Sequence, residues 1–379
     1  MTGTLKAVRV CHMTTLHRRD DARVRLKECA TLAKAGYKVT LLVADGKGNT
    51  EPRGSTDGVG VVDAGLRPGK HRERFRFSAS VMLTKAREID AQIYHFHDPE
   101  LIPAGLALKR DGKVVVYDSH EDLPRQLLSK TYIAGSKAKL ASIAAEVGED
   151  YAARRFDAVI AVTESIFTRF EKFAKRTVLV ANYPSLEDLG LEVLSTPKRE
   201  RRICYVGGLS IIRGSRSLLQ ASKICKYPIH AAGSFDDEGV RQEILAQDSR
   251  VIYRGFLGRR ELADFMTSSM AGIMTYLPRP NHINAMPTKL YDYMAAGLPV
   301  IVSDFPLWRN IVEAGECGIC VDPENPSSIA EAIERLLDRP EEAARMGANA
   351  RRLVVEGGRN WSAASKRLLD LYSTLEPAI

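Results

Sequence analysis

The sequence predicts an α/β protein with two domains, each containing a parallel β-sheet. Strand and helix patterns alternate along the chain, as they do where parallel strands are joined by crossover helices. Several strand patterns, including 114–117 and 300–302, are continuous β-branched or aromatic runs, which are typical of strands buried on both faces. The length of 379 residues suits two domains that each bury a core.

The composition is that of a globular protein from a reducing compartment. Hydrophobic residues make up 45% of the chain and charged residues 27%. No apolar run approaches the ~20 residues of a membrane-spanning helix, and residues 1–6 lack the apolar core of a signal peptide. The scattered cysteines indicate a cytoplasmic, reduced protein. We expect Cys317 and Cys320 to pack around a core strand at 319–321 rather than to hold a metal.

The net charge of +8 suits an anionic partner. The sequence has neither zinc-finger spacing nor an aromatic RNA-binding motif, which disfavours nucleic acid. The run from Arg67 to Phe77 interleaves basic and aromatic side chains. A solvated face is the simpler interpretation of this run. The alternative is contact with anionic lipid headgroups, which would place the protein on the inner face of the plasma membrane.

The chain opens with a strand at 7–11, a loop at 12–21 and a helix at 22–35. The loop follows the carboxyl end of a parallel strand, where open α/β sheets bind ligands. It lacks the glycine-rich fingerprint of nicotinamide-binding proteins and is instead dense in His, Arg and Asp. Asp20 and Asp21 are therefore candidate residues of a cleft, although a solvated charged loop explains them equally well.

The strands at 93–96 and 114–117 both end in histidines and carboxylates. The first is followed by His97 and Asp98, and the second by a segment that contains His120 and Glu121. We expect His120 to serve a functional site, because a core histidine would more naturally fall inside a strand. For His97 the sequence supports a functional role and a packing role equally. The candidate residues of a cleft in this first half of the chain are then Asp20, Asp21, His97, Asp98 and Glu121.

The turn after the strand at 203–206 is a candidate phosphate site. Gly207 and Gly208 would let the backbone approach a phosphate, and Arg213 could pair with it through two N–H groups. Arg216 is a second cation nearby. A surface turn with solvated arginines is the alternative.

The segment 287–304 predicts a short helix, a stop at Gly297 and a buried strand. The unpaired N–H groups at the start of a helix form an anion site. Lys289 lies in that first turn, and Asp292 follows one turn later on the same side. On spacing alone, a solvated Lys–Asp pair is a slightly better interpretation.

This last segment resembles the C-terminal signature of the family 4 glycosyltransferases, which have the GT-B fold of two Rossmann-like domains facing a cleft. The signature contains two acidic residues that are separated by seven other residues. Here Asp292 takes the second acidic position, and Asn284 departs from the pattern at the first. Residues 117–122 also resemble the Asp-x-His-Glu segment of one branch of the family, in which the histidine faces the donor sugar.

Other parts of the second half carry the same resemblance. Arg213-Gly214 matches the Lys-Gly of the family pattern Gly-Arg-Leu-x-x-x-Lys-Gly, while Gly208 stands in place of its Arg. Gly233 and the loop around Phe256 match the family's strand–Gly and base-contacting segments. With Gly208 in place of the family's Arg, one cation that would pair with the diphosphate is missing. Arg216 or Lys289 could take its role.

The resemblance implies a domain organisation. We expect an acceptor-binding domain at 1–184, a linker at 185–201 and a nucleotide-sugar-binding domain at 202–358. A helix at 359–379 would then cross back to the first domain. The linker lacks a strand pattern and becomes very basic near its end.

The resemblance also implies retaining glycosyl transfer without a cofactor. Arg213 and Lys289 would neutralise the leaving diphosphate, Asp292 would bind the ribose hydroxyls, and His120 would hydrogen-bond the donor sugar. No Asp-x-Asp sequence occurs, so we expect no metal, and no carboxylate nucleophile is evident, which favours front-face attack. The donor would be a UDP- or GDP-sugar, and the acceptor a glycan or lipid-linked saccharide in cell-surface polysaccharide synthesis.

Two alternatives stay open at this point. A nucleotide-sugar 2-epimerase would share the fold but would need no acceptor. A non-catalytic lipid or polyanion binder would bind its ligand without releasing nucleotide.

The neutral amide of Asn284 favours a donor with an N-acetyl or uronic acid group, whose oxygen a carboxylate would repel.

Overall fold

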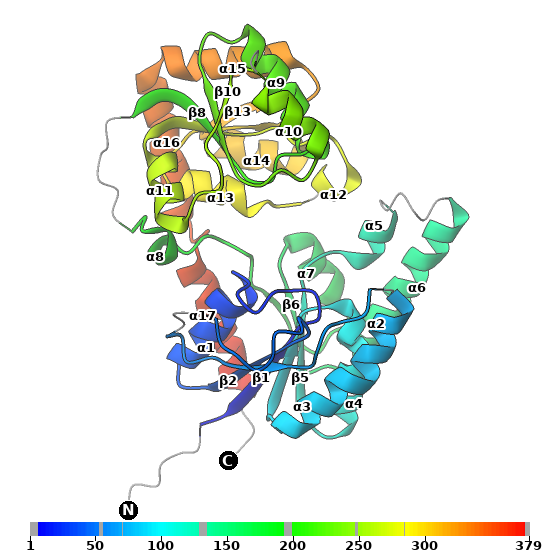
Figure 1. Cartoon of the computed structure of the whole chain (residues 1–379). Coiled ribbons are helices and arrows are strands. Elements are labelled where there is room, and N and C mark those ends of the chain that lie inside the picture. Colours follow the sequence, from blue (N-terminus) through cyan, green and yellow to red (C-terminus); the bar gives the residue numbers. More distant parts are fainter. Residues whose placement is uncertain are drawn as a thin grey trace, which may run out of the picture. The chain divides into compact units, whose positions relative to one another are not determined.

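The computed structural model describes residues 7–52, 56–69, 71–128, 135–192, 199–246, 249–283 and 285–375 (Figure 1). The chain divides into two compact units. The first unit contains Met1–Asn182 and Ala363–Ile379, and the second contains Tyr183–Ser362. Asn284 lies outside the described residues.

The described residues of the first unit form a seven-stranded sheet in which all neighbouring strands are parallel. Across the sheet the order is β3 (Gly60–Asp63), β2 (Lys38–Val43), β1 (Arg9–Met13), β4 (Ile93–Phe96), β5 (Val114–Ser119), β6 (Ala158–Ala161) and β7 (Thr177–Leu179). The first helix begins as a π-helical turn, η1 (Val24–Cys29), and continues as α1 (Ala30–Lys34). The later helical segments are α2 (His71–Phe77), η2 (Ser78–Met82), α3 (Leu83–Ile89), η3 (Pro99–Leu101), α4 (Ile102–Arg110), α5 (Leu123–Leu128), α6 (Ser136–Ala153) and α7 (Glu164–Phe170).

The core of the first unit forms where helices press onto the central strands. Phe96 of β4 stacks on Tyr117 of β5, with ring centroids 4.9 Å apart. Gly105 of α4 lies against this layer, because a Cβ at that position would be 2.7 Å from the Phe96 ring. The helix therefore packs closely on the strands that carry the polar residues described below.

The described part of the second unit forms a six-stranded parallel sheet. Its order is β10 (Val251–Tyr253), β9 (Ile229–Ala232), β8 (Glu200–Val206), β11 (Ser269–Met274), β12 (Val300–Ser303) and β13 (Gly318–Val321). The helical segments are α8 (Leu186–Leu189), η4 (Ile211–Arg213), α9 (Ser215–Ile224), α10 (Glu238–Leu245), α11 (Arg259–Thr267), α12 (Pro280–Ile283), α13 (Thr288–Ala295), α14 (Pro306–Ala314), α15 (Pro326–Asp338) and α16 (Pro340–Val355). The last helix, α17 (Trp361–Leu375), starts in the second unit and continues from Ala363 in the first.

One tyrosine fixes α13 against its sheet. The Tyr293 hydroxyl accepts a hydrogen bond from the Val206 N–H of β8 at 2.7 Å and donates to the Ile273 carbonyl of β11 at 3.3 Å. Gly272 makes room for the ring, since a Cβ there would be 2.4 Å from it. Tyr293 thus fixes the position of α13 relative to the end of β8.

The structure differs from the sequence prediction in two places. The strand β1 runs to Met13, so His12 lies in the sheet rather than in the predicted loop. The segment 185–201 contains α8 and the start of β8. Glu200 and Arg201 are exposed charged residues at the entrance to β8, which explains why they showed no strand pattern. Residues 193–198 of the predicted linker lie outside the described residues.

The predicted core strand at 319–321 is part of β13, with Cys317 buried just before it and Cys320 within it. Among the described residues, no helix combines the length and apolar character that a membrane span requires.

Candidate functional site

Each unit gathers polar residues at the carboxyl ends of its central strands. In the first unit they form a group that we call the histidine cluster, comprising His12, His95, His97, His120, Arg23, Glu28, Asp118 and Tyr372. The parallel register explains the gathering, because His12 of β1 pairs with His95 of β4. Most of the cluster is fully buried, and His120 is its partly exposed end.

The carboxylate of Asp118 orders the protons at one end of this cluster. Its Oδ2 lies 2.7 Å from His120 Nε2 and 3.1 Å from His97 Nδ1. Burial alone would raise the pKa of Asp118, but the Arg23 guanidinium and His120 hold it well below its usual range. An ionised carboxylate only accepts hydrogen bonds, so His120 Nε2 and His97 Nδ1 must both donate.

The same reasoning assigns, one after another, which ring nitrogen carries the proton in the other histidines. With its proton on Nδ1, His97 accepts at Nε2 from His12 Nδ1, 3.0 Å away. His12 Nε2 then accepts from the Tyr372 hydroxyl at 3.4 Å, and that hydroxyl accepts from His95 Nδ1 at 2.9 Å. The result is one hydrogen-bonded chain from the partly exposed His120 to the fully buried His95.

Charge in the histidine cluster is balanced internally. Arg23 Nη2 lies 2.9 Å from Glu28 Oε1 and 3.2 Å from Asp118 Oδ1. Burial raises the pKa of Glu28 well above its usual value. Burial also lowers the pKa of His97 to about 4 in spite of its bond to Asp118. We therefore expect His12, His95 and His97 to be neutral around the buried Arg23–Asp118 pair.

Two sets of side chains in the described structure have the donor atoms and spacing of a metal site. They are His12, Glu28, His95 and His97, and the overlapping set His97, Asp118 and His120, each with ligand atoms within 4.8 Å of one another. Arg23 already pairs with both carboxylates, and the two sets share His97. The arrangement therefore fits a proton-ordered network better than a resident cation.

The loop beside His120 carries two of the predicted acceptor-side residues. Asp98 Oδ2 accepts from the N–H groups of Thr15 at 2.6 Å and Leu16 at 3.1 Å, so it shapes the loop after β1. Asp21 lies 3.3 Å from His17 Nδ1. Burial would lower the pKa of His17, but Asp21 and Asp98 raise it.

The structure thus brings His97 within 3.2 Å of His120, and Asp21 and Asp98 flank His17, whose ring centroid is 4.8 Å from that of His120. Asp20 pairs instead with the exposed Arg18 at 2.9 Å. Glu121 directly follows His120, but its carboxylate accepts a hydrogen bond from Gln126 of α5.

In the second unit, three glycines shape the turn at the ends of β8 and β9. The backbone φ of Gly207 is +140° and that of Gly233 is +143°. A Cβ on Gly233 would lie 1.9 Å from the Gly207 carbonyl oxygen, so the two backbones touch. The hydroxyls of Tyr205 and Tyr253 donate to the carbonyls of Gly208 and Gly233, each at 2.7 Å. The turn is therefore rigid before any ligand binds.

Arg213 lies directly over this turn. A Cβ on Gly208 would be 2.0 Å from Arg213 Nη1, so the glycine leaves the space that the guanidinium occupies. Arg213 also pairs with Asp236 at 3.0 Å, and both side chains are partly exposed. The structure brings Gly207, Gly208, Gly233 and Arg213 together, as the sequence suggested.

The start of α13 holds the second predicted pair. Lys289 Nζ lies 3.1 Å from Asp292 Oδ2, with Lys289 partly exposed and Asp292 nearly buried. The N-cap residue is Pro287, which offers no side-chain cap to the first N–H groups of the helix. Phe256, the predicted base-contacting residue, follows β10 and is 82% exposed.

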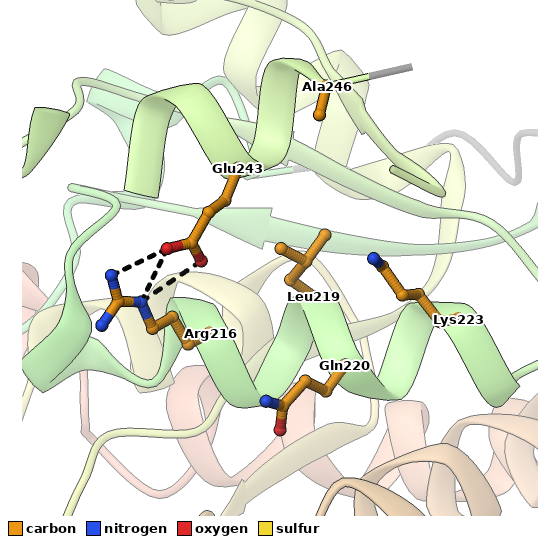
Figure 2. Close-up of a pocket in the computed structure, with 6 residues that line it drawn as sticks. All are labelled: Arg216, Leu219, Gln220, Lys223, Glu243 and Ala246. Carbon is orange, nitrogen blue, oxygen red and sulfur yellow. Dashed lines mark hydrogen bonds and ion pairs between the residues drawn. The ribbon is translucent and has the colours of Figure 1, made fainter. Parts of the chain in front are cut away.

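Arg216 lies apart from the glycine turn. It pairs with Glu243 of α10 at 2.7 Å, in a shallow groove between α9 and α10 (Figure 2). Leu219, Gln220, Lys223 and Ala246 complete that groove. The predicted replacement of the missing family cation by Arg216 would thus require the Glu243 pair to open.

Sequence reasoning missed five members of the histidine cluster. A histidine inside an apolar strand, as His95 is, was the available signal for His12 and His95. Arg23 and Glu28 resembled an ordinary charged helix face. Tyr372 could not be found, because it lies 277 residues from its hydrogen-bond partner His95.

Comparison with known proteins matches both halves of the chain. The family model of glycosyltransferase family 4 matches residues 22–182, and that of the group 1 glycosyl transferases matches residues 191–353. The D-rhamnosyltransferase WbpZ of Pseudomonas aeruginosa is 25% identical over 280 residues, which are 70% of this chain and 68% of that protein.

Two solved structures share the fold over nearly the whole chain. Sucrose-phosphate synthase from Thermosynechococcus elongatus has a TM-score of 0.73 and 18% identity, covering 97% of this chain and 99% of that one. Anabaena HepE in complex with UDP and glucose has a TM-score of 0.70 and 15% identity, covering 97% and 100%.

The proton order of the histidine cluster can be tested by ¹⁵N NMR of the imidazole rings. We expect His97 and His12 to be neutral with the proton on Nδ1, and His97 to stay neutral well below the ordinary histidine pKa of 6.5, because its own pKa is about 4. In the Tyr372→Phe variant, His12 should lose its Nε2 hydrogen bond while His97 keeps its tautomer. A His97 ring with its proton on Nε2, or one that is charged near pH 6.5, would contradict the network.

The contact between the two glycine backbones predicts a large cost for a side chain at Gly233. Gly233→Ala should lower the free energy of unfolding of the second unit by about 3 kcal/mol or more, because both strain and a collision are introduced. Gly190→Ala is the control, since its φ of +64° is also positive but a Cβ there meets no described heavy atom within 4 Å. It should cost only about 1 kcal/mol. Equal costs in urea denaturation would show that the contact is dispensable.

Proposed function

The chain is a GT-B glycosyltransferase of the family 4 and group 1 type, and on this premise we propose that it transfers a sugar from a UDP- or GDP-sugar with retention of configuration. The acceptor we propose is a glycan or a lipid-linked saccharide. The observation that carries the proposal is the guanidinium of Arg213 held over the glycine turn of the second unit.

The donor diphosphate is proposed to bind at this turn. Gly207 and Gly208 let the phosphate approach the backbone, and Arg213 can reach it once it leaves Asp236. The uncapped N–H groups and Lys289 at the start of α13 would add further positive charge. Asp292 would then exchange its Lys289 partner for ribose hydroxyls. The UDP in the HepE structure supports a uridine donor among the candidates.

His120 is proposed to contact the donor sugar from the first unit. In the neutral form of His120 with its proton on Nε2, which donates to Asp118, Nδ1 has a lone pair that can accept a hydrogen bond from a sugar hydroxyl. The buried part of the histidine cluster would keep this ring from rotating. His120 would thus read the sugar through a single fixed atom.

The proposed reaction has no metal and no carboxylate nucleophile. The sequence lacks Asp-x-Asp, so charge on the leaving diphosphate would be stabilised by Arg213, Lys289 and the α13 N-terminus. The acceptor hydroxyl would attack on the face from which the diphosphate leaves. The 2-epimerase alternative is not favoured, because both family models and the WbpZ match describe glycosyltransferases.

The proposal is tested by thermal denaturation with UDP-, GDP- and ADP-sugars. A donor that binds only the folded protein raises the Tm in a concentration-dependent manner. We expect one nucleotide series to do so and the matching nucleoside diphosphate to be released when an acceptor is added. If no nucleotide-sugar raises the Tm and none is turned over, the proposed function is wrong.

Removal of the guanidinium over the turn should impair catalysis more than folding. Arg213→Ala should lower kcat/KM by at least about a hundredfold, on the order of 3 kcal/mol, as expected for a lost group that stabilises developing charge. Arg241→Ala is the control, since Arg241 is an exposed arginine of α10 that pairs with Glu238. A folded Arg213→Ala enzyme with unchanged kcat/KM would refute the assignment.

The amide at position 284 predicts donor preference. Asn284→Asp should shift relative kcat/KM among donors of one nucleotide by at least ~1 kcal/mol, because a carboxylate repels the N-acetyl or uronate oxygen that an amide can bind. The comparison uses N-acetylhexosamine, uronic acid and plain hexose donors. Unchanged ratios would mean that Asn284 does not contact the sugar.

A further inference from the structure

The long helix α6 of the first unit (Figure 1) exposes its large apolar side chains and buries small or charged ones. The residues that it buries are Ala138, Ser142, Glu149, Ala152 and Ala153, which are small or charged. Its large apolar side chains are exposed instead: Leu140 by 70%, Ile143 by 59%, Val147 by 63% and Tyr151 by 50%. These four, which we call the α6 apolar face, follow the three- and four-residue spacing of one helix surface.

A continuous apolar surface of this kind is unusual on a protein that meets only water. From Leu140 to Tyr151 the face extends over twelve residues, or about 16 Å at the rise of an α-helix. Scattered exposed apolar residues need no explanation, but four on one helix surface indicate a partner.

The acidic residues of α6 are paired with arginines of neighbouring helices. Glu146 pairs with Arg125 of α5 at 2.8 Å. Glu149 and Asp150 both pair with Arg169 of α7, at 2.8 Å and 2.7 Å. Each negative charge is therefore paired with a cation, and Glu149 is also buried.

Basic residues lie at both ends of the α6 apolar face. Lys137 and Lys139 are exposed at its start, and Arg154 and Arg155 are exposed at its end. The Arg155 guanidinium stacks on the Tyr151 ring, 3.4 Å from its centroid. An apolar centre with cations at each end, and with its neighbouring acids paired to arginines, is the pattern of a helix that lies in an anionic membrane interface.

We propose that the α6 apolar face binds the surface of an anionic phospholipid bilayer. Leu140, Ile143 and Val147 enter the headgroup–acyl boundary, and the basic residues contact lipid phosphates. This proposal deepens the proposed function, on which it rests for the idea of a lipid-linked acceptor, by identifying where the enzyme meets the membrane.

The structure makes α6 a better membrane contact than the run from Arg67 to Phe77 suggested by the sequence. Phe77 packs against the core of the first unit, and Arg74 lies 3.4 Å from Glu100. Phe75, 46% exposed, is the large apolar side chain that α2 offers to solvent among its described residues.

Vesicle flotation tests the proposal with the full-length protein. We expect binding to vesicles of phosphatidylcholine mixed with phosphatidylglycerol at low salt, weaker binding at high salt, and little binding to phosphatidylcholine alone. The double variant Leu140→Ser/Val147→Ser should lower the partition coefficient at least about tenfold, because apolar contact with the acyl region is lost. Lys137→Glu/Lys139→Glu should reduce binding to the anionic vesicles only.

Matched controls separate α6 from other surfaces. Ile224→Ser removes a side chain of similar exposure, 58%, from the second unit and should leave flotation unchanged. Phe75→Ala tests the α2 alternative and should have little effect. Because all of the altered side chains are exposed, loss of folding is not expected, and the Tm of each variant checks this.

Each outcome decides one question. If the wild type does not float with anionic vesicles, or if the α6 variants float as well as the wild type, the inference is wrong. Self-association of the wild type that disappears in Leu140→Ser/Val147→Ser, without vesicle binding, would assign the face to a second copy and also overturn it. Nucleotide-sugar binding is measured in solution in the same samples, so a failure of the proposed function is recognised separately.

Discussion

The buried ion pair between Asp118 and Arg23 is the interaction on which the polar site of the first unit depends. A carboxylate at this depth would normally be protonated, and the guanidinium keeps it charged. Once charged, it can only accept, and every proton in the chain from His120 to His95 follows from that fact. Loss of Arg23 would leave Asp118 as an uncompensated buried charge, at a cost of about 3–5 kcal/mol. The pair thus determines both the stability of the site and the orientation of the His120 ring.

In the second unit, the geometry of the glycine turn depends on the absence of side chains at Gly208 and Gly233. Gly233 touches the Gly207 carbonyl, and Gly208 vacates the volume that the Arg213 guanidinium fills. The family pattern has an arginine at position 208, so this chain holds one fewer cation at the turn. Arg213 lies close enough to the missing side chain to take over its space. The departure from the family pattern therefore changes how the turn is filled, and in the proposed diphosphate site the positive charge at the turn would come from Arg213.

Local features of the sequence predicted much of the fold and part of the site. The strand at 300–302, the start of α13 and the glycine turn are specified by residues close together in the chain, and the structure has them where the pattern indicated. The histidine cluster is different, because its contacts join β1, β4, β5, η1 and α17. A hydroxyl contributed by Tyr372 cannot be assigned to His95 until the last helix is placed against the first sheet. Arg216 shows the same limitation. Its ion-pair partner Glu243 lies on another helix, α10, so the sequence around Arg216 does not reveal the pair.

Ion pairs and packing between residues distant in sequence also explain why the run from Arg67 to Phe77 exposes less charge and less apolar area than its sequence suggests. In the run from Arg67 to Phe77, Glu100 neutralises Arg74, and the core covers Phe77. Both partners are distant in sequence, so the pattern alone overstates the free charge and the exposed apolar area. The helix α6 presents the opposite case. Its acids are paired with Arg125 and Arg169, which leaves Lys137, Lys139, Arg154 and Arg155 around an apolar centre. The positive character of that face arises from tertiary ion pairs that withdraw the negative charges, and not from an excess of basic residues in the helix itself.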